Sequence, residues 1–289
     1  MRNLLHNPLH ARKYRFRVNR SPLALPARLL AGLLFINLLG ISAHGQDANS
    51  ELLAKAGKLY YSSAKNGLTG FDCTLHRDWQ ALFMAVDKTQ TVAEDDPRIV
   101  ALNTVKIILH ARLKGGSTID WIRVAAQGKP LDKESVTLLE NQHKDTEQAL
   151  LGVLQLWIPF IDGSIVPESP EGAEIKNTAD GHTFYAEQGG NKLTEVFDND
   201  LVLRHFDVEM NGTSVKLVPV FEPTDKGLLV NRFDVTTLPA GTAPDKAQEM
   251  HVGVEYQTIR GFPIPQQLNI KLGETGVFNF TLDGCRVNP

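Results

Sequence analysis

The sequence predicts an α+β fold in which a curved antiparallel sheet, an incomplete β-barrel, is packed with helices. Residues 182–283 contain eight successive strand-like segments, and several of them alternate an apolar face with a polar face. A helical pattern precedes the first strand of the chain, and a second helical segment over 133–158 is strongly apolar. We therefore expect an N-terminal helix and a long apolar helix packed against the sheet or inside it.

Charge is distributed unevenly along the 289 residues, of which 42% are hydrophobic and 22% charged. The formal charge is −3, but residues 1–45 hold seven Arg or Lys side chains and no Asp or Glu. Without this segment, 23 basic and 33 acidic residues remain, a formal charge of −10. A body of this charge repels phosphate backbones, so we expect no nucleic-acid partner.

Residues 1–45 have the three parts of a secretory signal peptide: a basic stretch, an apolar run over 29–43, and small residues at a cleavage point. Ala43 and Gly45 occupy the −3 and −1 positions of a cut before Gln46. The alternative is an uncleaved anchor, although the run is shorter than the roughly 20 residues that span a bilayer. We expect export to the periplasm of a Gram-negative bacterium, membrane contact only through the leader, and a single domain over 46–289.

The first part of this domain mixes helical and strand patterns. It predicts, in order, a helix over 48–64, a strand over 70–78, a helix over 79–92 and a hairpin over 105–124. Pro97, after three acidic residues, is expected to close the second helical segment. Gly115-Gly116 supplies the two-residue turn of the hairpin.

The longest predicted helix runs from about Lys133 to Ile158. Its first half is polar, with Val136 and Leu139 facing inward, and its second half is apolar nearly all round. A helix that is hydrophobic on every side must be enclosed or must face a ligand or a membrane. The apolar run is too short to cross a membrane, so core packing and ligand contact remain as the two interpretations.

The rest of the chain is predicted to be β, with strands at 182–187, 192–198, 201–208, 214–221, 228–236, 250–258, 264–272 and 276–283. The alternation is sharpest in the last three strands. One solvent-exposed face and one apolar face are typical of an antiparallel sheet that curves around a hydrophobic interior. Asn211-Gly212 and Lys226-Gly227 are the hairpin signals.

Cys73 and Cys285 are the two cysteines, and in an oxidising compartment they predict one disulfide. The alternative is a pair of unrelated buried thiols. Strand alternation places Cys73 on the apolar face but Cys285 on the polar face, and a bend at Gly284 would remove this conflict. Neither cysteine has a CxxC neighbour, which argues against redox catalysis.

Motifs that carry chemistry are missing from the sequence. The six histidines after residue 45 show no HxH, HxxxH or HExxH spacing, and no GxSxG, GxGxxG or GxxxxGK[ST] motif occurs. Paired carboxylates lie beside Pro97 at a predicted helix end and at Asp198/Asp200 in a predicted turn, where solvation explains them. We therefore expect no catalytic residue, no metal site and no cofactor, and the protein is predicted not to be an enzyme.

Residues 254–268, VEYQTIRGFPIPQQL, followed by an alternating strand pair, resemble the signature of bacterial outer-membrane lipoprotein carriers and their LolA-like relatives. The resemblance implies an incomplete barrel with helices as a lid, whose cavity holds acyl chains. The helical stretch 79–100 departs from it, because those carriers continue the sheet there. Uncharacterised secreted bacterial proteins with the same half-barrel are the alternative relatives.

Three functions follow as hypotheses. The first is a periplasmic protein that binds or carries a hydrophobic ligand or an acylated polypeptide. The second is a structural or interaction protein of the envelope with a filled core, and the third is a secreted hydrolase. For the first, the candidate ligand-lining residues are Leu154, Trp157, Phe160, Leu203, Phe233, Val252, Tyr256, Phe278 and Phe280.

Overall fold

The computed structural model describes residues 46–86, 91–124, 132–167, 173–188, 190–273 and 276–288. The predicted signal peptide therefore lies outside the described residues. None of the described helices is both long and apolar enough to cross a membrane.

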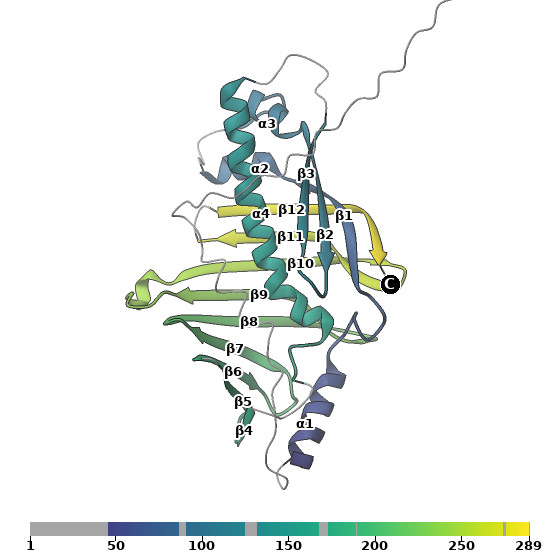
Figure 1. Ribbon diagram of the computed structural model, residues 1–289, viewed down its shortest axis with the longest axis vertical. Coiled ribbons are helices and arrows are strands. Elements are labelled where there is room, and N and C mark those ends of the chain that lie inside the picture. Colours follow the sequence, from purple (N-terminus) through teal and green to yellow (C-terminus); the bar gives the residue numbers. More distant parts are fainter. Residues whose placement is uncertain are drawn as a thin grey trace, which may run out of the picture.

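One antiparallel sheet organises the described chain, in the strand order β3-β2-β1-β12-β11-β10-β9-β8-β7-β6-β5-β4 (Figure 1). The strands are β1 (Gly70–Arg77), β2 (Val105–Arg112), β3 (Thr118–Arg123), β4 (Ala173–Thr178), β5 (Gly181–Gln188), β6 (Asn191–Phe197), β7 (Leu203–Met210), β8 (Thr213–Thr224), β9 (Gly227–Leu238), β10 (Gln248–Ile259), β11 (Phe262–Leu272) and β12 (Gly276–Asn288). The helices are α1 (Gln46–Leu59), α2 (Trp79–Val86), α3 (Pro97–Leu102) and α4 (Lys133–Asp162), with a 3₁₀ turn η1 (Pro244–Lys246). The predicted α+β class with an open, curved antiparallel sheet is confirmed.

The first and last strands of the described chain, β1 and β12, are neighbours inside the sheet. β12 pairs with β1 on one side and with β11 on the other. Opposite Cys73, the register between β1 and β12 shifts, and Gly284 adopts a left-handed φ of 54°. This is the bend that the strand alternation required, and Cys73 and Cys285 form a disulfide across it.

The region after β1 differs from the prediction. α2 ends at Val86 instead of near residue 92, and Pro97 begins α3 instead of closing a helix. Asp96 caps α3, because its carboxylate accepts a hydrogen bond from the Arg98 backbone N–H at 2.9 Å. Proline suits the first helical position, where its missing N–H would have had no partner. β4, which was not predicted, adds one strand at the edge of the sheet.

α4 continues through Pro159 to Asp162, beyond the predicted end at Ile158, and is capped by Gly163, whose φ is 84°. A proline inside a helix removes a backbone hydrogen bond and costs about 3 kcal/mol. The extra turn places Phe160 and Ile161 in the core, where both are at most 2% exposed. Tertiary packing therefore outweighs the local preference.

Candidate functional site

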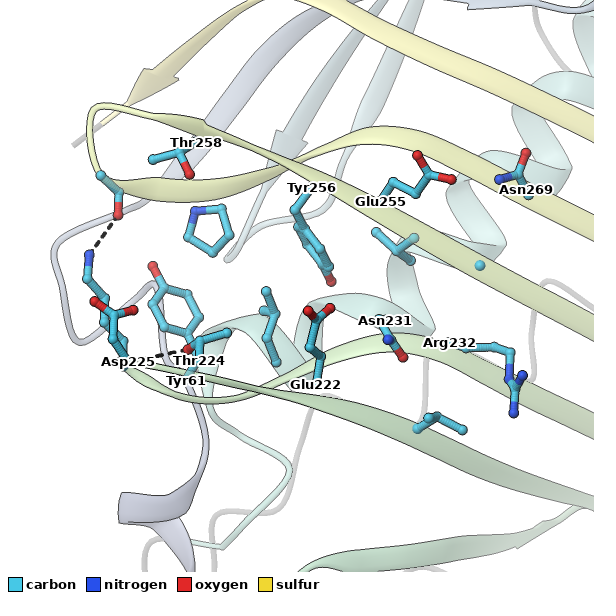
Figure 2. Close-up of a pocket in the computed structure, with 17 residues that line it drawn as sticks. Tyr61, Glu222, Thr224, Asp225, Asn231, Arg232, Glu255, Tyr256, Thr258 and Asn269 are labelled. Atoms are coloured by element: carbon cyan, nitrogen blue, oxygen red, sulfur yellow. Dashed lines mark hydrogen bonds between the residues drawn. The ribbon is translucent and has the colours of Figure 1, made fainter.

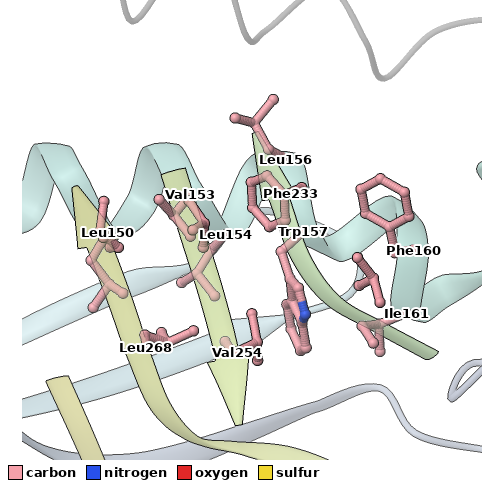
Figure 3. Packing of buried hydrophobic residues seen from close by; sticks show 14 of the residues in the cluster. Leu150, Val153, Leu154, Leu156, Trp157, Phe160, Ile161, Phe233, Val254 and Leu268 are labelled. Carbon is pink, nitrogen blue, oxygen red and sulfur yellow. The ribbon is translucent and has the colours of Figure 1, made fainter. Parts of the chain in front are cut away.

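The helix-facing side of the sheet is its apolar surface, and the second half of α4 is seated on it (Figure 3). All nine predicted ligand-lining residues belong to the same hydrophobic core, eight as buried members and Tyr256 packed against it. Three project from α4 and six from β7, β9, β10 and β12: Leu154, Trp157, Phe160, Leu203, Phe233, Val252, Tyr256, Phe278 and Phe280. The structure therefore brings together residues that are up to 126 positions apart in the predicted set, which runs from Leu154 to Phe280.

These side chains pack against one another. The rings of Phe160 and Phe233 stack with centroids 6.1 Å apart, and those of Trp157 and Tyr256 stack at 6.4 Å. Seven of the nine residues are at most 2% exposed. The surface that was predicted to line a ligand site is thus covered by α4 itself.

Tyr256 makes the polar link between α4 and the sheet. The Trp157 indole N–H donates to the Tyr256 hydroxyl at 2.9 Å, and that hydroxyl donates to the Val230 carbonyl of β9. Burial raises the pKa of the Tyr256 hydroxyl, and the nearby Glu222 carboxylate adds to the shift. The Tyr256 hydroxyl is therefore protonated and neutral at physiological pH.

Arg77 is a buried cation at the end of β1, only 7% exposed. Its guanidinium carbon lies 4.6 Å from the centroid of the Trp79 ring and 4.5 Å from that of Phe278. One nitrogen donates to Thr146 and Gln142 of α4 at 2.6 and 3.0 Å. The other two nitrogens are buried without a hydrogen-bond partner among the described residues, and burial lowers the pKa of the guanidinium to about 10.

Glu195 is a buried carboxyl group on the same face of the sheet. Its neighbours in register are Phe184 on β5 and Phe206 on β7, and the ring of Phe206 faces Phe160 of α4 at 6.4 Å. One carboxyl oxygen has no hydrogen-bond partner among the described residues. Burial raises the pKa of Glu195 to about 8, so the group is mostly protonated at neutral pH.

A cavity of about 840 Å³ lies on the other side of Tyr256 (Figure 2). The pairing of β9 with β10 ends at Arg232 and Gly253, and beyond this pair the β8–β9 hairpin diverges from the β10–β11 hairpin. At the hairpin tips, Lys226 Nζ donates to the Gly261 carbonyl at 2.9 Å and spans the gap. We call this opening the hairpin window, and Tyr61 and Tyr256 lie within it.

The sequence contained a signal for the burial of Arg77 and Glu195 but none for the hairpin window. Arg77 continues the apolar face of Phe71, Cys73 and Leu75, and Glu195 falls on the face of Phe197, so period-two alternation alone marks both as buried. The hairpin window has no such signal, because it forms where two neighbouring strands, β9 and β10, stop pairing. Among the described residues, no group of three or more His, Cys, Asp or Glu is arranged to hold a metal ion.

No protein-family model and no curated protein matches this chain. Among solved structures, it is similar to an outer-membrane lipoprotein-sorting protein domain from Vibrio parahaemolyticus. The identity is 9%, the match covers 83% of this chain and 92% of that one, and the TM-score is 0.25.

Proposed function

We propose that the protein is a non-catalytic binding protein of the cell envelope that takes up an apolar ligand, such as the acyl chain of a lipid or of an acylated protein. The ligand occupies the apolar surface under α4, and α4 moves aside to admit it. The observation that carries the proposal is Arg77, a cation held under α4 with two buried nitrogens unpaired among the described residues.

A buried donor without a partner costs about 1–3 kcal/mol. Arg77 therefore lowers the free energy needed to separate α4 from the sheet, because opening gives its nitrogens access to water. Its two hydrogen bonds to α4, at Thr146 and Gln142, would break in the same step. A core built only for stability would place an apolar side chain at this position.

The free energy needed to expose the buried face of α4 is similar to the free energy gained by burying one or two acyl chains. α4 buries seven apolar side chains between Leu150 and Ile161. Exposing them costs on the order of 10–20 kcal/mol, at about 1.5–3 kcal/mol each. Burying an acyl chain of about 16 carbons contributes roughly 12 kcal/mol of favourable free energy, at about 0.8 kcal/mol per buried CH₂.

An extracytoplasmic location fits the proposal. The predicted leader over 1–45 and the Cys73–Cys285 disulfide both suit an oxidising envelope compartment. The stretch that resembles lipoprotein carriers, 254–268, forms most of the β10–β11 hairpin and includes Tyr256, which contacts α4.

The direct test is native mass spectrometry of the protein purified from the envelope of its own host, with uptake of a fluorescent fatty acid as a second measurement. We expect a bound lipid-sized mass and saturable uptake. A ligand-free spectrum together with no uptake would overturn the proposal.

Arg77→Met tests the role of the buried cation. The variant removes the unpaired nitrogens and retains an apolar side chain, so we expect a higher free energy of unfolding and weaker fatty-acid uptake. Arg204→Met is the matched control, because Arg204 is a surface residue whose side chain is 65% exposed. Unchanged uptake in Arg77→Met would contradict the proposed opening of α4.

A second candidate is a structural or interaction protein of the envelope with a filled core and no ligand. The close packing of the nine interface residues favours it, since seven of them are at most 2% exposed. In that case the protein is ligand-free in the native spectrum and takes up no fatty acid.

A further inference from the structure

The strand β4 forms one edge of the sheet (Figure 1). Among the described residues it pairs only with β5, so one side of its backbone has no strand partner. An edge of this kind presents a row of N–H and C=O groups to which another strand can bind, and proteins often block it with a proline or a bulge. β4 has the sequence AEIKNT, without proline, and pairs with β5 in a continuous register.

The turn of the β4–β5 hairpin decides which backbone groups of β4 face outward. Thr178 and Gly181 are paired in register on either side of a two-residue turn. The residues that close such a turn exchange hydrogen bonds, and bonded and non-bonded pairs then alternate along the ladder. The even-numbered residues of β4 therefore direct their N–H and C=O groups at β5. The odd-numbered residues, Ala173, Ile175 and Asn177, direct theirs at the free edge.

Two copies of β4 fit one another about a two-fold axis that passes Ile175. Such an axis runs the two strands antiparallel and brings the same surface of both copies together. Residues 173, 175 and 177 of one copy then lie opposite residues 177, 175 and 173 of the other. All of these residues direct their backbone groups outward, so each pair can exchange two N–H···O=C bonds.

The side chains of Glu174 and Lys176 match in the same register. They project from one face of β4, 58% and 64% exposed, with Lys176 Nζ 3.3 Å from the Glu174 carboxylate. With the axis at Ile175, Glu174 lies opposite Lys176 of the second copy, and Lys176 lies opposite Glu174. These are non-hydrogen-bonded pairs, in which the Cα atoms are about 4.5 Å apart and the side chains are closest.

Charge also disfavours the neighbouring registers. An axis at residue 174 places Glu174 opposite its own copy, and an axis at residue 176 does the same for Lys176. Like charges directly opposite one another are destabilising. Opposite charges therefore select the register centred on Ile175.

Ile175 adds an apolar contact at the centre of this interface. It is partly buried against the hydrophobic core, and its register partner on β5, Phe184, is only 3% exposed. At the axis, Ile175 meets Ile175 of the second copy. The apolar side of the sheet that faces α4 then continues from one copy into the other.

The opposite edge of the sheet, β3, lacks this complementarity. Its one acidic residue, Asp120, shares a strand face with Thr118 and Ile122 and with no cation of β3. Only residues of the same face can lie opposite one another in an antiparallel pair. A second copy paired along β3 would therefore bring no opposite charges together.

We propose that the free edge of β4 is a self-association surface, on which a second copy of this chain pairs antiparallel about Ile175. The two sheets then form one continuous sheet. One pair of short strands buries less than the roughly 1,200 Å² of a stable interface, so the dimer is weak. We expect a Kd on the order of 10–100 µM. The dimer does not depend on a ligand under α4.

Sedimentation velocity of the purified protein from about 5 to about 500 µM measures the association. We expect the wild type to shift from monomer to dimer across this range. Lys176→Glu and Glu174→Lys each place like charges opposite one another, so each variant alone should dimerise at least roughly tenfold more weakly. Lys246→Glu is the control, because it changes the charge by the same amount at an exposed lysine of η1 and should dimerise as the wild type does.

An equimolar mixture of Lys176→Glu and Glu174→Lys tests the register itself. One variant carries two carboxylates on β4 and the other carries two amino groups, so in the mixed dimer every charged pair is again opposite in sign. We expect the mixture to dimerise as the wild type does, a recovery that misfolded variants would not show. A monomeric wild type at the highest concentration, unchanged dimers of either single variant, or no recovery in the mixture would overturn the proposal.

Discussion

Trp157 and Tyr256 join α4 to β10 through a hydrogen bond from the indole N–H to the phenol oxygen, 2.9 Å long. The same phenol group donates to the Val230 carbonyl of β9. Tyr256 thus bridges a helix and a neighbouring strand at the point where β9 and β10 have already separated.

Tyr256→Phe is therefore expected to lower the free energy of unfolding by about 1–3 kcal/mol, because it leaves the Trp157 N–H and the Val230 carbonyl without their partner. Urea denaturation followed by tryptophan fluorescence measures the change. Tyr185→Phe is the matched control, since the Tyr185 hydroxyl is exposed and bonds to Glu187 at 3.2 Å. Equal effects of the two substitutions would show that the bridge contributes nothing.

Glu195 predicts a pH dependence of stability. Its pKa is about 8 in the folded protein and near 4.5 in the unfolded chain, so the folded state binds this proton more tightly. The free energy of unfolding therefore falls as pH rises from about 4.5 to about 8, by up to roughly 5 kcal/mol from this group. Below this interval its contribution is constant.

Glu195→Gln removes the titration but keeps the size of the side chain. We expect the variant to have a shallower fall in stability between pH 5 and pH 8 than the wild type, as measured by urea denaturation across that range. Parallel pH profiles for the two proteins would mean that Glu195 is ionised in the folded state.

Alanine substitutions at Gly227 and Gly57 are expected to have opposite effects on the free energy of unfolding. Gly227 has a φ of 118°, and a Cβ there would lie 2.8 Å from the Leu59 carbonyl oxygen and 2.9 Å from the Tyr61 nitrogen. Gly227→Ala should therefore lower the free energy of unfolding by about 2 kcal/mol or more, because it strains the backbone and pushes α1 away from β9.

Gly57 lies inside α1, where an added Cβ would meet no atom within 4 Å. Gly57→Ala is expected to raise stability by about 0.5–1 kcal/mol, because alanine loses less backbone entropy in a helix. Thermal or urea denaturation of both variants measures the contrast. Destabilisation by Gly57→Ala would show that α1 is not helical at this position.

The disulfide is expected to contribute strongly to stability because its cysteines are 212 positions apart in the sequence. Replacing both Cys73 and Cys285 by Ala should lower the free energy of unfolding by about 2–5 kcal/mol. Urea denaturation with and without a reductant measures this, and the reductant should shift the wild-type midpoint but leave the double variant unchanged. A wild-type midpoint insensitive to complete reduction would contradict the prediction.

Strand alternation predicted the sheet well where one face is uniformly apolar. β10, β11 and β12 follow it, and the same pattern identified the residues that meet α4. The disulfide was also predictable, including the need for a bend at Gly284. These features depend on a local repeat of two residues, which the sequence displays directly.

The remaining differences arise from contacts between distant segments. Pro159 stays inside α4 because Phe160 and Ile161 gain burial in a core made by other elements. The hairpin window is lined by Tyr61, which follows α1 and whose backbone N–H donates to the Leu228 carbonyl of β9. Such contacts leave no periodic trace in either segment.

The position of β12 sets the order in which the protein can be completed. β12 is the last strand of the described chain, yet it lies between β1 and β11. Until it is available, β1, β2 and β3 are not paired by backbone hydrogen bonds with the remaining eight strands, and Cys73 has no cysteine with which to form a disulfide. Closing so long a loop is slow. A chain emerging from a ribosome or a translocation pore would therefore remain two separate, exposed half-sheets until β12 arrives, a period in which chaperones have access to the apolar face.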